Sequence, residues 1–232
     1  MYFSHSSEIW RDYPELVPGV LLATGITRDR SSGDQAAKFN TIAESRLRRN
    51  SEGELPEVQA WRRVFSRMGL KPTQYRCASE SLLRRFRKEK SLPHLHPMID
   101  LCNSVSLAFA IPVAVFDISR IAEYIEVRYA SGSELYETFA GGIENPEPRE
   151  VIFADGLGRA HARRWSNRQS GYSAVRDGTT TVLIVAEAVH TSAYEDVQKL
   201  TAALANEIQL IWSAAPKTAI LNNFSPRFEF LP

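Results

Sequence analysis

The segment from residue 93 to residue 117 constrains the fold of this chain more than any other. A proline-rich entry (93–97) leads into an apolar stretch (98–109), and Pro112 then begins a short run that ends in Phe116-Asp117. Proline suits the first turn of a helix and the first residue of a strand, and it breaks the interior of either element. The segment therefore predicts a largely buried helix, Asn103 in its middle, followed directly by a strand.

The part of the chain before this segment is predicted to be largely helical. Ser32-Gly33-Asp34 offers a helix start, apolar residues then recur at helical spacing, and Gly53 and Gly69 follow the ends of two such runs. The expected elements are a strand over 16–27 and helices over 33–49, 57–68 and 79–88.

The part after it has the pattern of a sheet closed by one helix. Short runs of β-branched and aromatic residues alternate with Gly- and Pro-rich connections, and a long amphipathic run follows. Helices followed by strands predict an α+β fold. We expect one domain over 1–232, with a helical, basic part (1–91) and a sheet-rich core (92–232). The expected strands are 113–116, 125–128, 151–154, 160–164 and 180–186, and the expected C-terminal helix is 193–213.

Composition indicates an ordinary globular protein. The chain has 232 residues, of which 44% are hydrophobic, enough for one sizeable core. No apolar run approaches the roughly 20 residues that span a bilayer, and the first residues lack the pattern of a signal peptide. We therefore expect a cytoplasmic protein that does not contact membranes. Cys77 and Cys102 have no metal-ligand or redox spacing and are expected to be buried thiols.

Positive charge is concentrated in residues 62–90, which we call the basic band. This band holds ten basic residues against Glu80 and Glu89, whereas the whole chain carries a net charge of only +1. Such a band is expected where a phosphate backbone binds, and a solvated helix face is the alternative. The candidate RNA-binding residues are Arg84, Arg85, Arg87 and Lys88.

Several reaction classes find no support in the sequence. It has no phosphate-binding loop of the Gly-x-x-x-x-Gly-Lys-Ser/Thr type and no Gly-x-Ser-x-Gly elbow. His94 and His96 have no evident third ligand, so an ordinary loop role is favoured over metal binding. We expect no metal and no cofactor.

The chemically richest loop spans residues 163–173. It places Arg164 and Arg168 beside Trp165, Gln169 and Ser170. Guanidinium groups bind phosphates or carboxylates, and the amide and the hydroxyl could orient a substrate amine or a water. The alternative is a surface turn held by ion pairs to Glu144 or Asp155. Loops held by a sheet commonly carry binding residues, which favours the functional interpretation.

Two further residues have open interpretations. Asn103 lies in an apolar helix, where its amide needs partners, so it either ties the backbone or lines a pocket. Glu187 ends the apolar strand 182–186 and either activates a water, holds an amino group or pairs with an arginine.

Several of these motifs resemble the B3/B4 editing module of the phenylalanyl-tRNA synthetase beta subunit. The similarity extends from about Leu92 to Ala188. It rests on a proline, Asp100, Asn103 and Pro112-x-x-x-Phe116-Asp117, then on the run around Arg128, on 151–155, on Ser173, Val175 and Thr179, and on Glu187-Ala188. Ala114 or Val115 stands where many of these synthetases have a His, and Gln169-Ser170 where they have Gly-Gly. The resemblance implies a B3/B4-like mixed sheet, and the two departures imply an altered pocket whose preference need not be tyrosine.

The resemblance also implies a function. We expect a free-standing protein that binds tRNA or aminoacyl-tRNA at its 3′ end and hydrolyses a mischarged ester, with no role for DNA. The catalytic candidates are Glu187, Gln169 and Ser170, and the substrate-binding candidates are Asn103, Arg128, Arg164 and Arg168. A non-catalytic module that binds a free amino acid or RNA is the alternative, and a third possibility is an accessory protein whose basic band meets an acidic partner.

Overall fold

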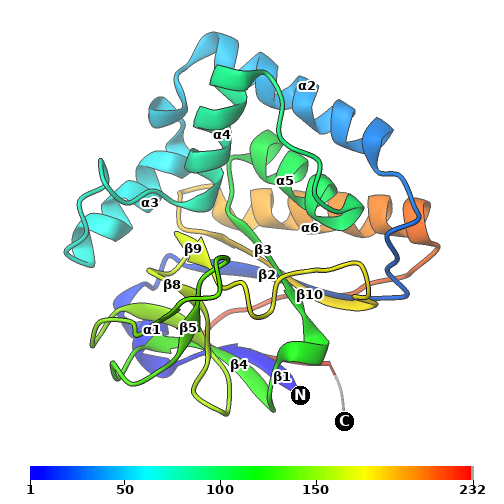
Figure 1. Ribbon diagram of the computed structural model, residues 1–232. Helices are drawn as coiled ribbons and strands as arrows, with labels where there is room; N and C mark the ends of the chain where they lie inside the picture. Colours follow the sequence, from blue (N-terminus) through cyan, green and yellow to red (C-terminus); the bar gives the residue numbers. More distant parts are fainter. Residues whose placement is uncertain (231–232) are drawn as a thin grey trace.

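The computed structural model describes residues 1–230 and has three layers (Figure 1). Helices α2 to α6 form the upper layer, a four-stranded sheet lies beneath them, and a six-stranded sheet with the short helix α1 lies at the bottom. None of the helices in residues 1–230 is long and apolar enough to span a membrane. The helices are α1 (Ser7–Asp12), α2 (Gly33–Arg49), α3 (Pro56–Arg67), α4 (Ala78–Glu89), α5 (Pro97–Phe109) and α6 (Ala193–Trp212), with short 3₁₀ turns at Glu52–Glu54 and Ile118–Arg120.

The central sheet is entirely antiparallel. Its strand order is β11-β2-β10-β3, and β2 pairs with β10 along the full length of both strands. These strands are β11 (Lys217–Ile220), β2 (Val17–Thr24), β10 (Thr181–Ala188) and β3 (Val113–Asp117).

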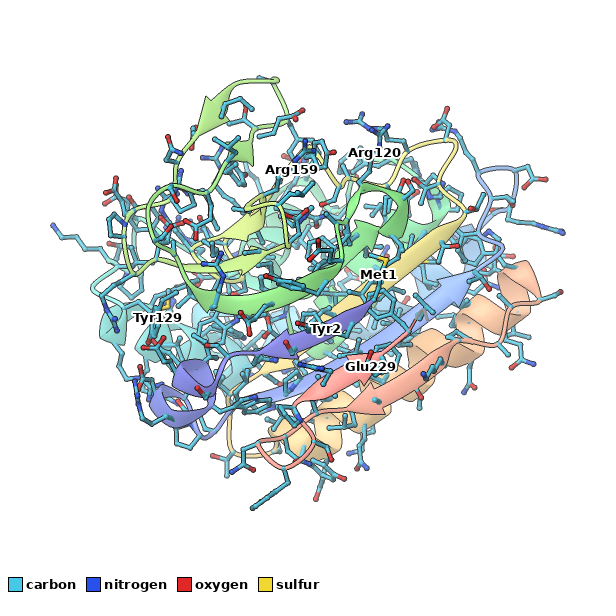
Figure 2. All side chains as sticks on the ribbon, turned by 90° about the horizontal axis from the view of Figure 1, so that it is seen from below. Met1, Tyr2, Arg120, Tyr129, Arg159 and Glu229 are labelled. Atoms are coloured by element: carbon cyan, nitrogen blue, oxygen red, sulfur yellow. The ribbon has the colours of Figure 1, made fainter. Side chains whose placement is uncertain are left out.

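The second sheet is mixed, with strand order β12-β1-β4-β7-β8-β9. Only the β1–β4 pair is parallel. Figure 2 shows Tyr2 of β1 beside Glu229 of β12, as the strand register requires. The strands are β12 (Arg227–Glu229), β1 (Tyr2–His5), β4 (Tyr124–Tyr129), β7 (Val151–Ala154), β8 (Ala160–Arg163) and β9 (Arg168–Gln169); β5 (Tyr136–Glu137) and β6 (Ile143–Glu144) form a separate hairpin.

The central sheet is buried on both faces, which explains why its strands are almost continuously apolar. Along β10, Ile184 packs with α5 and α6, whereas Leu183 and Val185 pack with the second sheet. Side chains alternate between the faces of a strand. Glu187, two residues after Val185, therefore points into the layer between the two sheets.

The predicted fold class is confirmed. The four helices expected over 33–49, 57–68, 79–88 and 193–213 are present within a residue or two of these bounds. The first predicted strand is shorter, Val17–Thr24, and the four-residue strand β1 before it was not predicted. Both cysteines are free and buried, as expected.

Candidate functional site

A small cavity lies between the two sheets, beneath the start of α4. It has a volume of about 60 Å³. Most of its wall is apolar, and its polar side chains come from Glu187, from the turn after β8 and from β9. The lining residues are Ala78, Val113, Ala114, Phe153, Ala162, Trp165, Asn167, Arg168, Gln169, Val185 and Glu187, with Pro112 and Ser166. We call this cavity the inter-sheet pocket.

Glu187 is the only acidic residue in the wall of this pocket, and both oxygens of its carboxyl group have partners. Oε1 lies 2.6 Å from Nε2 of His5, and Oε2 accepts a hydrogen bond of 3.0 Å from the indole of Trp165. Trp61 donates to the backbone carbonyl of Glu187 at 3.2 Å. Glu187 and His5 are each only 3% exposed. His5 and Trp165 thus fix the carboxyl group in one orientation, and Trp61 holds the backbone of the same residue.

His5 reaches Glu187 because of its place in β1. Phe3 and His5 share one face of this short strand, and Phe3 is fully buried between the two sheets. His5 packs edge-on against Phe3 and lies 5.1 Å from the ring of Trp10. Its second ring nitrogen, Nδ1, is buried and has no hydrogen-bond partner within residues 1–230. The imidazole therefore has Glu187 as its one polar contact in this part of the chain.

Trp165 sits in a strained turn. Arg164 and Trp165 have φ angles of 47° and 55° in the turn after β8. Non-glycine residues rarely adopt a positive φ, because this conformation costs about 1–3 kcal/mol for each residue. It persists mainly where the surrounding structure holds the backbone in place. Trp165 is fully buried and packs edge-on against Trp61 and Tyr13 at 5.2 and 4.8 Å. This packing holds the indole against Glu187.

The pocket brings together three of the predicted site residues: Glu187, Arg168 and Gln169. The Arg168 side chain is 47% exposed and lies 3.9 Å from Glu144, so its guanidinium is accessible. The amide nitrogen of Gln169 donates to the carbonyl of Val115 at 2.6 Å. That bond anchors Gln169 to β3 across the mouth of the pocket.

The other candidates lie elsewhere. Ser170 is buried, and its hydroxyl donates to the carbonyl of Glu137 at 2.8 Å. Arg128 binds Glu134 at 2.6 Å, and Arg164 lies over the ring of Tyr75. Asn103 lines a second cavity between α2 and α5 rather than the inter-sheet pocket. The roles of all four remain predictions.

The alternatives left open for the loop and for Glu187 can now be compared with the geometry. Arg163 binds both Glu144 and Glu150, at 2.6 and 2.9 Å, so part of the Arg-rich loop is indeed held by ion pairs. The hydrogen bond that Arg163 donates to Glu150 is the main reason that the pKa of Arg163 is raised. Glu187 pairs with a histidine rather than an arginine.

Much of the basic band is neutralised by ion pairs. Arg84 and Arg87 both bind Glu52, at 3.0 and 2.9 Å, and Arg85 binds Glu89 at 2.9 Å. Lys88 makes no ion pair with the residues that the structure describes. The band therefore presents less free charge than the sequence indicates.

One group of side chains has the composition of a metal site. A ligand atom from each of Glu57, His190 and Asp196 lies within 4.8 Å of the other two. These groups already have protein partners, since His190 lies 2.9 Å from Asp196 and Arg46 binds Glu57 at 2.7 Å. Their contacts support a structural role at the start of α3 and α6, and the absence of a metal remains a prediction.

Comparison with known families shows which family the chain belongs to. The sequence profile of the B3/4 domain matches residues 60–206. The chain belongs to the B3/4 domain family. The matched segment runs from α3 into α6 and includes Trp61, Trp165 and Glu187, whereas His5 lies outside it. The predicted family is therefore confirmed.

Individual relatives are distant. No curated protein matches this B3/4 domain chain significantly. Among solved structures, it is similar to an N-terminal fragment of the phenylalanyl-tRNA synthetase beta subunit from Pyrococcus horikoshii, with 8% identity and a TM-score of 0.47. The alignment covers 95% of this chain and 54% of the other, so this chain spans about half the length of that fragment.

Sequence reasoning missed His5 and Trp61 as part of the site. The alternation in Tyr2-Phe3-Ser4-His5, with aromatic residues of high β-propensity, was the available signal for β1. Nothing in the sequence pairs a histidine at position 5 with a glutamate at position 187, because only the layered packing of two sheets brings them together.

Proposed function

We propose that this B3/4 domain binds the aminoacylated 3′ end of a tRNA and hydrolyses the ester of a wrongly attached amino acid. The observation that carries the proposal is the carboxyl group of Glu187, fixed by His5 and Trp165 in the wall of a mostly apolar pocket. A carboxylate in such a place is suited to remove a proton from water, and preorganisation of this kind contributes much of the catalysis in enzymes.

The proposed reaction has two steps. Glu187 takes a proton from a water in the pocket while the water oxygen bonds to the ester carbonyl carbon. The tetrahedral intermediate then collapses, the bond from carbon to the ribose oxygen breaks, and the proton passes from Glu187 to that oxygen. The amino acid is formed as a carboxylic acid, which loses its remaining proton to bulk water and leaves as a carboxylate. No covalent enzyme intermediate is needed, because an activated ester reacts readily with a positioned water.

The mouth of the pocket supplies groups for the negative charge of the substrate. Arg168 is half-exposed there, and α4 begins with Ala78 in the pocket wall. A helix N-terminus and a guanidinium both favour an anion, here the developing oxyanion or a phosphate of the terminal nucleotide. Gln169 is held in place beside them by its bond to Val115.

A non-catalytic binding module is the second candidate. One observation favours it: both oxygens of Glu187 already have partners, so the carboxyl group has less capacity to accept a proton from water. In that case the pocket would hold an amino acid or an RNA end without turnover.

The deciding experiment measures release of labelled amino acid from correctly and wrongly charged tRNAs. The variants are Glu187→Gln and Arg168→Ala, and Arg227→Ala is the matched control because its side chain is similarly exposed, at 53%, on a different edge of the fold. Release by the wild type and by Arg227→Ala, with loss in the other two, supports the hydrolase. Binding without release in the wild type supports the module.

A further inference from the structure

A second cavity lies between α2 and α5, on the helical side of the central sheet (Figure 1). It shares no lining residue with the inter-sheet pocket. Positions at helical spacing on the two facing helices form most of its wall. They are Gly33, Ala36, Ala37 and Asn40 on α2 and Pro97, Asp100, Asn103 and Ser104 on α5, and residues 30–32 and 91–94 complete the wall. We call this space the helix cavity.

Several polar side chains in the wall of the helix cavity have no hydrogen-bond partner. Ser104 and Ser32 are only 3% and 4% exposed, yet neither hydroxyl makes a hydrogen bond within residues 1–230. The side-chain oxygen of Asn40 is buried without a partner, and the amide of Asn103 makes no hydrogen bond in the same part of the chain. Buried polar groups in proteins are nearly always hydrogen-bonded. A cavity lined by four such unpaired side chains is therefore suited to a polar ligand.

The chemistry of these groups indicates the class of ligand. Hydroxyls and amides both donate and accept hydrogen bonds, and a carboxylate such as that of Asp100 accepts several, so together they match the hydroxyls of a sugar. An ammonium ion suits Asp100 less well, because its carboxylate already has donors. Its Oδ1 accepts from the backbone N–H of Leu95 at 2.9 Å, and its Oδ2 lies 3.4 Å from Nδ1 of His94. The wall thus favours a ligand rich in neutral hydroxyls.

The part of the cavity beside the start of α2 favours negative charge. Arg30 and Gly33 line it there, and the N-cap residue Ser32 makes no side-chain bond to the helix. The first N–H groups of a helix and a guanidinium both attract a phosphate. Two lysines of the basic band, Lys88 and Lys90, lie just before residues 91–94 of the wall and make no ion pair with the residues that the structure describes. Positive charge therefore continues from the basic band toward the cavity.

We infer that the helix cavity binds a ribose phosphate, with the sugar hydroxyls on Asp100, Asn40 and Ser104 and the phosphate at Arg30 and the start of α2. The ribose phosphate belongs either to a free ribonucleotide or to an RNA chain. This inference does not depend on the proposed hydrolysis, because the two cavities share no residue. Helix α2 also lies outside residues 60–206, so the site extends beyond the segment that matches the B3/4 domain.

The first test measures binding of ribose 5-phosphate, ribose, AMP and 2′-deoxy-AMP by calorimetry. Loss of the phosphate or of the 2′-hydroxyl should each weaken binding about tenfold, because each leaves polar groups of the protein unpaired. Absence of binding by ribose 5-phosphate and AMP at millimolar concentrations would overturn the inference and leave the cavity to water. Equal affinities for AMP and 2′-deoxy-AMP, or tighter binding of free serine than of ribose 5-phosphate, would also overturn it.

Variants test whether the ligand occupies the helix cavity. Ser104→Ala and Asn40→Ala each remove one hydrogen-bonding group and should weaken binding of ribose 5-phosphate about three- to tenfold. Ser79→Ala is the matched control, because Ser79 is also a buried serine on a helix but does not line the cavity. Unchanged affinity in both cavity variants would overturn the inference. Glu187→Gln should leave this affinity unchanged, so the inference and the proposed hydrolysis can fail separately.

Competition distinguishes the two sources of the ribose phosphate. A short single-stranded RNA that displaces ribose 5-phosphate, and does so better than AMP and better than DNA of the same sequence, identifies an RNA chain as the ligand. Displacement by AMP at least as effective as that by RNA identifies a free ribonucleotide. Either result supports the inference, whereas failure of both AMP and RNA to displace ribose 5-phosphate would overturn it.

Discussion

Removal of the imidazole of His5 should destabilise the protein mainly through Glu187. The 2.6 Å contact is between two residues that are each 3% exposed, so water cannot replace the lost partner. Leaving a buried polar group without its hydrogen-bond partner costs about 1–3 kcal/mol, and more where the group is charged. Trp165 still holds the other oxygen of Glu187, so we expect His5→Ala to cost about 3 kcal/mol, with about 1 kcal/mol more from lost packing against Phe3 and Trp10.

A double-mutant cycle isolates the pair. In a Glu187→Ala background, His5→Ala removes only the packing contribution, so its cost should fall to about 1 kcal/mol and leave a coupling energy of about 2–3 kcal/mol. Urea unfolding at neutral pH gives the four stabilities, provided that the slope of the free energy with urea is the same in all four proteins. Additivity within about 0.5 kcal/mol would refute the argument, because independent sites behave in that way.

Glu187→Gln provides a gentler comparison. A glutamine of the same shape can accept from Trp165 while its amide donates to a histidine nitrogen, since a neutral imidazole presents a donor or an acceptor according to its tautomer. We expect this variant to lose less stability than Glu187→Ala and yet to lose the proposed activity. Equal stability losses would indicate that the shape of the carboxyl group does not matter to the packing.

Three further predictions concern other parts of the molecule. Burial alone would raise the pKa of Glu134, but the backbone N–H of Ser131 and the guanidinium of Arg128 outweigh this effect and lower the pKa to about 2. The ionised Glu134 therefore stabilises the fold above about pH 4.5, and this contribution is lost as the pH falls toward 2. In Glu134→Gln, the urea midpoint should depend less on pH over this range. Burial raises the pKa of the Cys77 thiol to about 11, so neither cysteine should react with a thiol reagent at pH 8 until the protein unfolds, and stoichiometric reaction of the native protein would contradict this. If the basic band binds tRNA, the affinity for tRNA should fall as the salt concentration rises. Lys88→Ala should weaken binding more than Arg85→Ala, because Arg85 is already paired with Glu89. An affinity that is unchanged between low and moderate salt would exclude the band as a phosphate-binding surface.

Local patterns in the sequence were sufficient for most elements of the fold. The run from Gly33 to Arg49 has helical spacing between clear start and stop residues, and α2 has those bounds. Strand β10 was equally clear, because a continuous β-branched run is typical of a strand buried on both faces. Strand β1 was missed since four residues carry little periodic signal, and its stability comes from pairing with β4 and β12, which are distant in the sequence.

The candidate site was less predictable, and the reasons differ from residue to residue. Glu187 and Arg168 were found because polar residues at the end of an apolar strand and in a long loop are conspicuous. Ser170 has the same kind of sequence signal, but its hydroxyl donates to the carbonyl of Glu137 and it does not line the pocket. Asn103 lies on the side of α5 that faces α2 rather than the inter-sheet pocket. The sequence pattern of a helix shows that it has a partly polar face, but it does not show which other helix or sheet packs against that face.

The partner of Glu187 lies outside the segment that matches the B3/4 domain. Residues 60–206 match the family, yet the closest polar partner of Glu187, His5, comes from β1. This strand lies between β4 and β12, so the partner of Glu187 is held in place by segments from both ends of the described chain (Figure 2). A carboxyl group buried between two sheets needs donors, because an unpaired one is costly. In this chain the residue opposite Glu187 therefore determines how the carboxyl group in the pocket wall is held, and a substitution at position 5 must either supply another donor or leave the carboxyl group unpaired on that side.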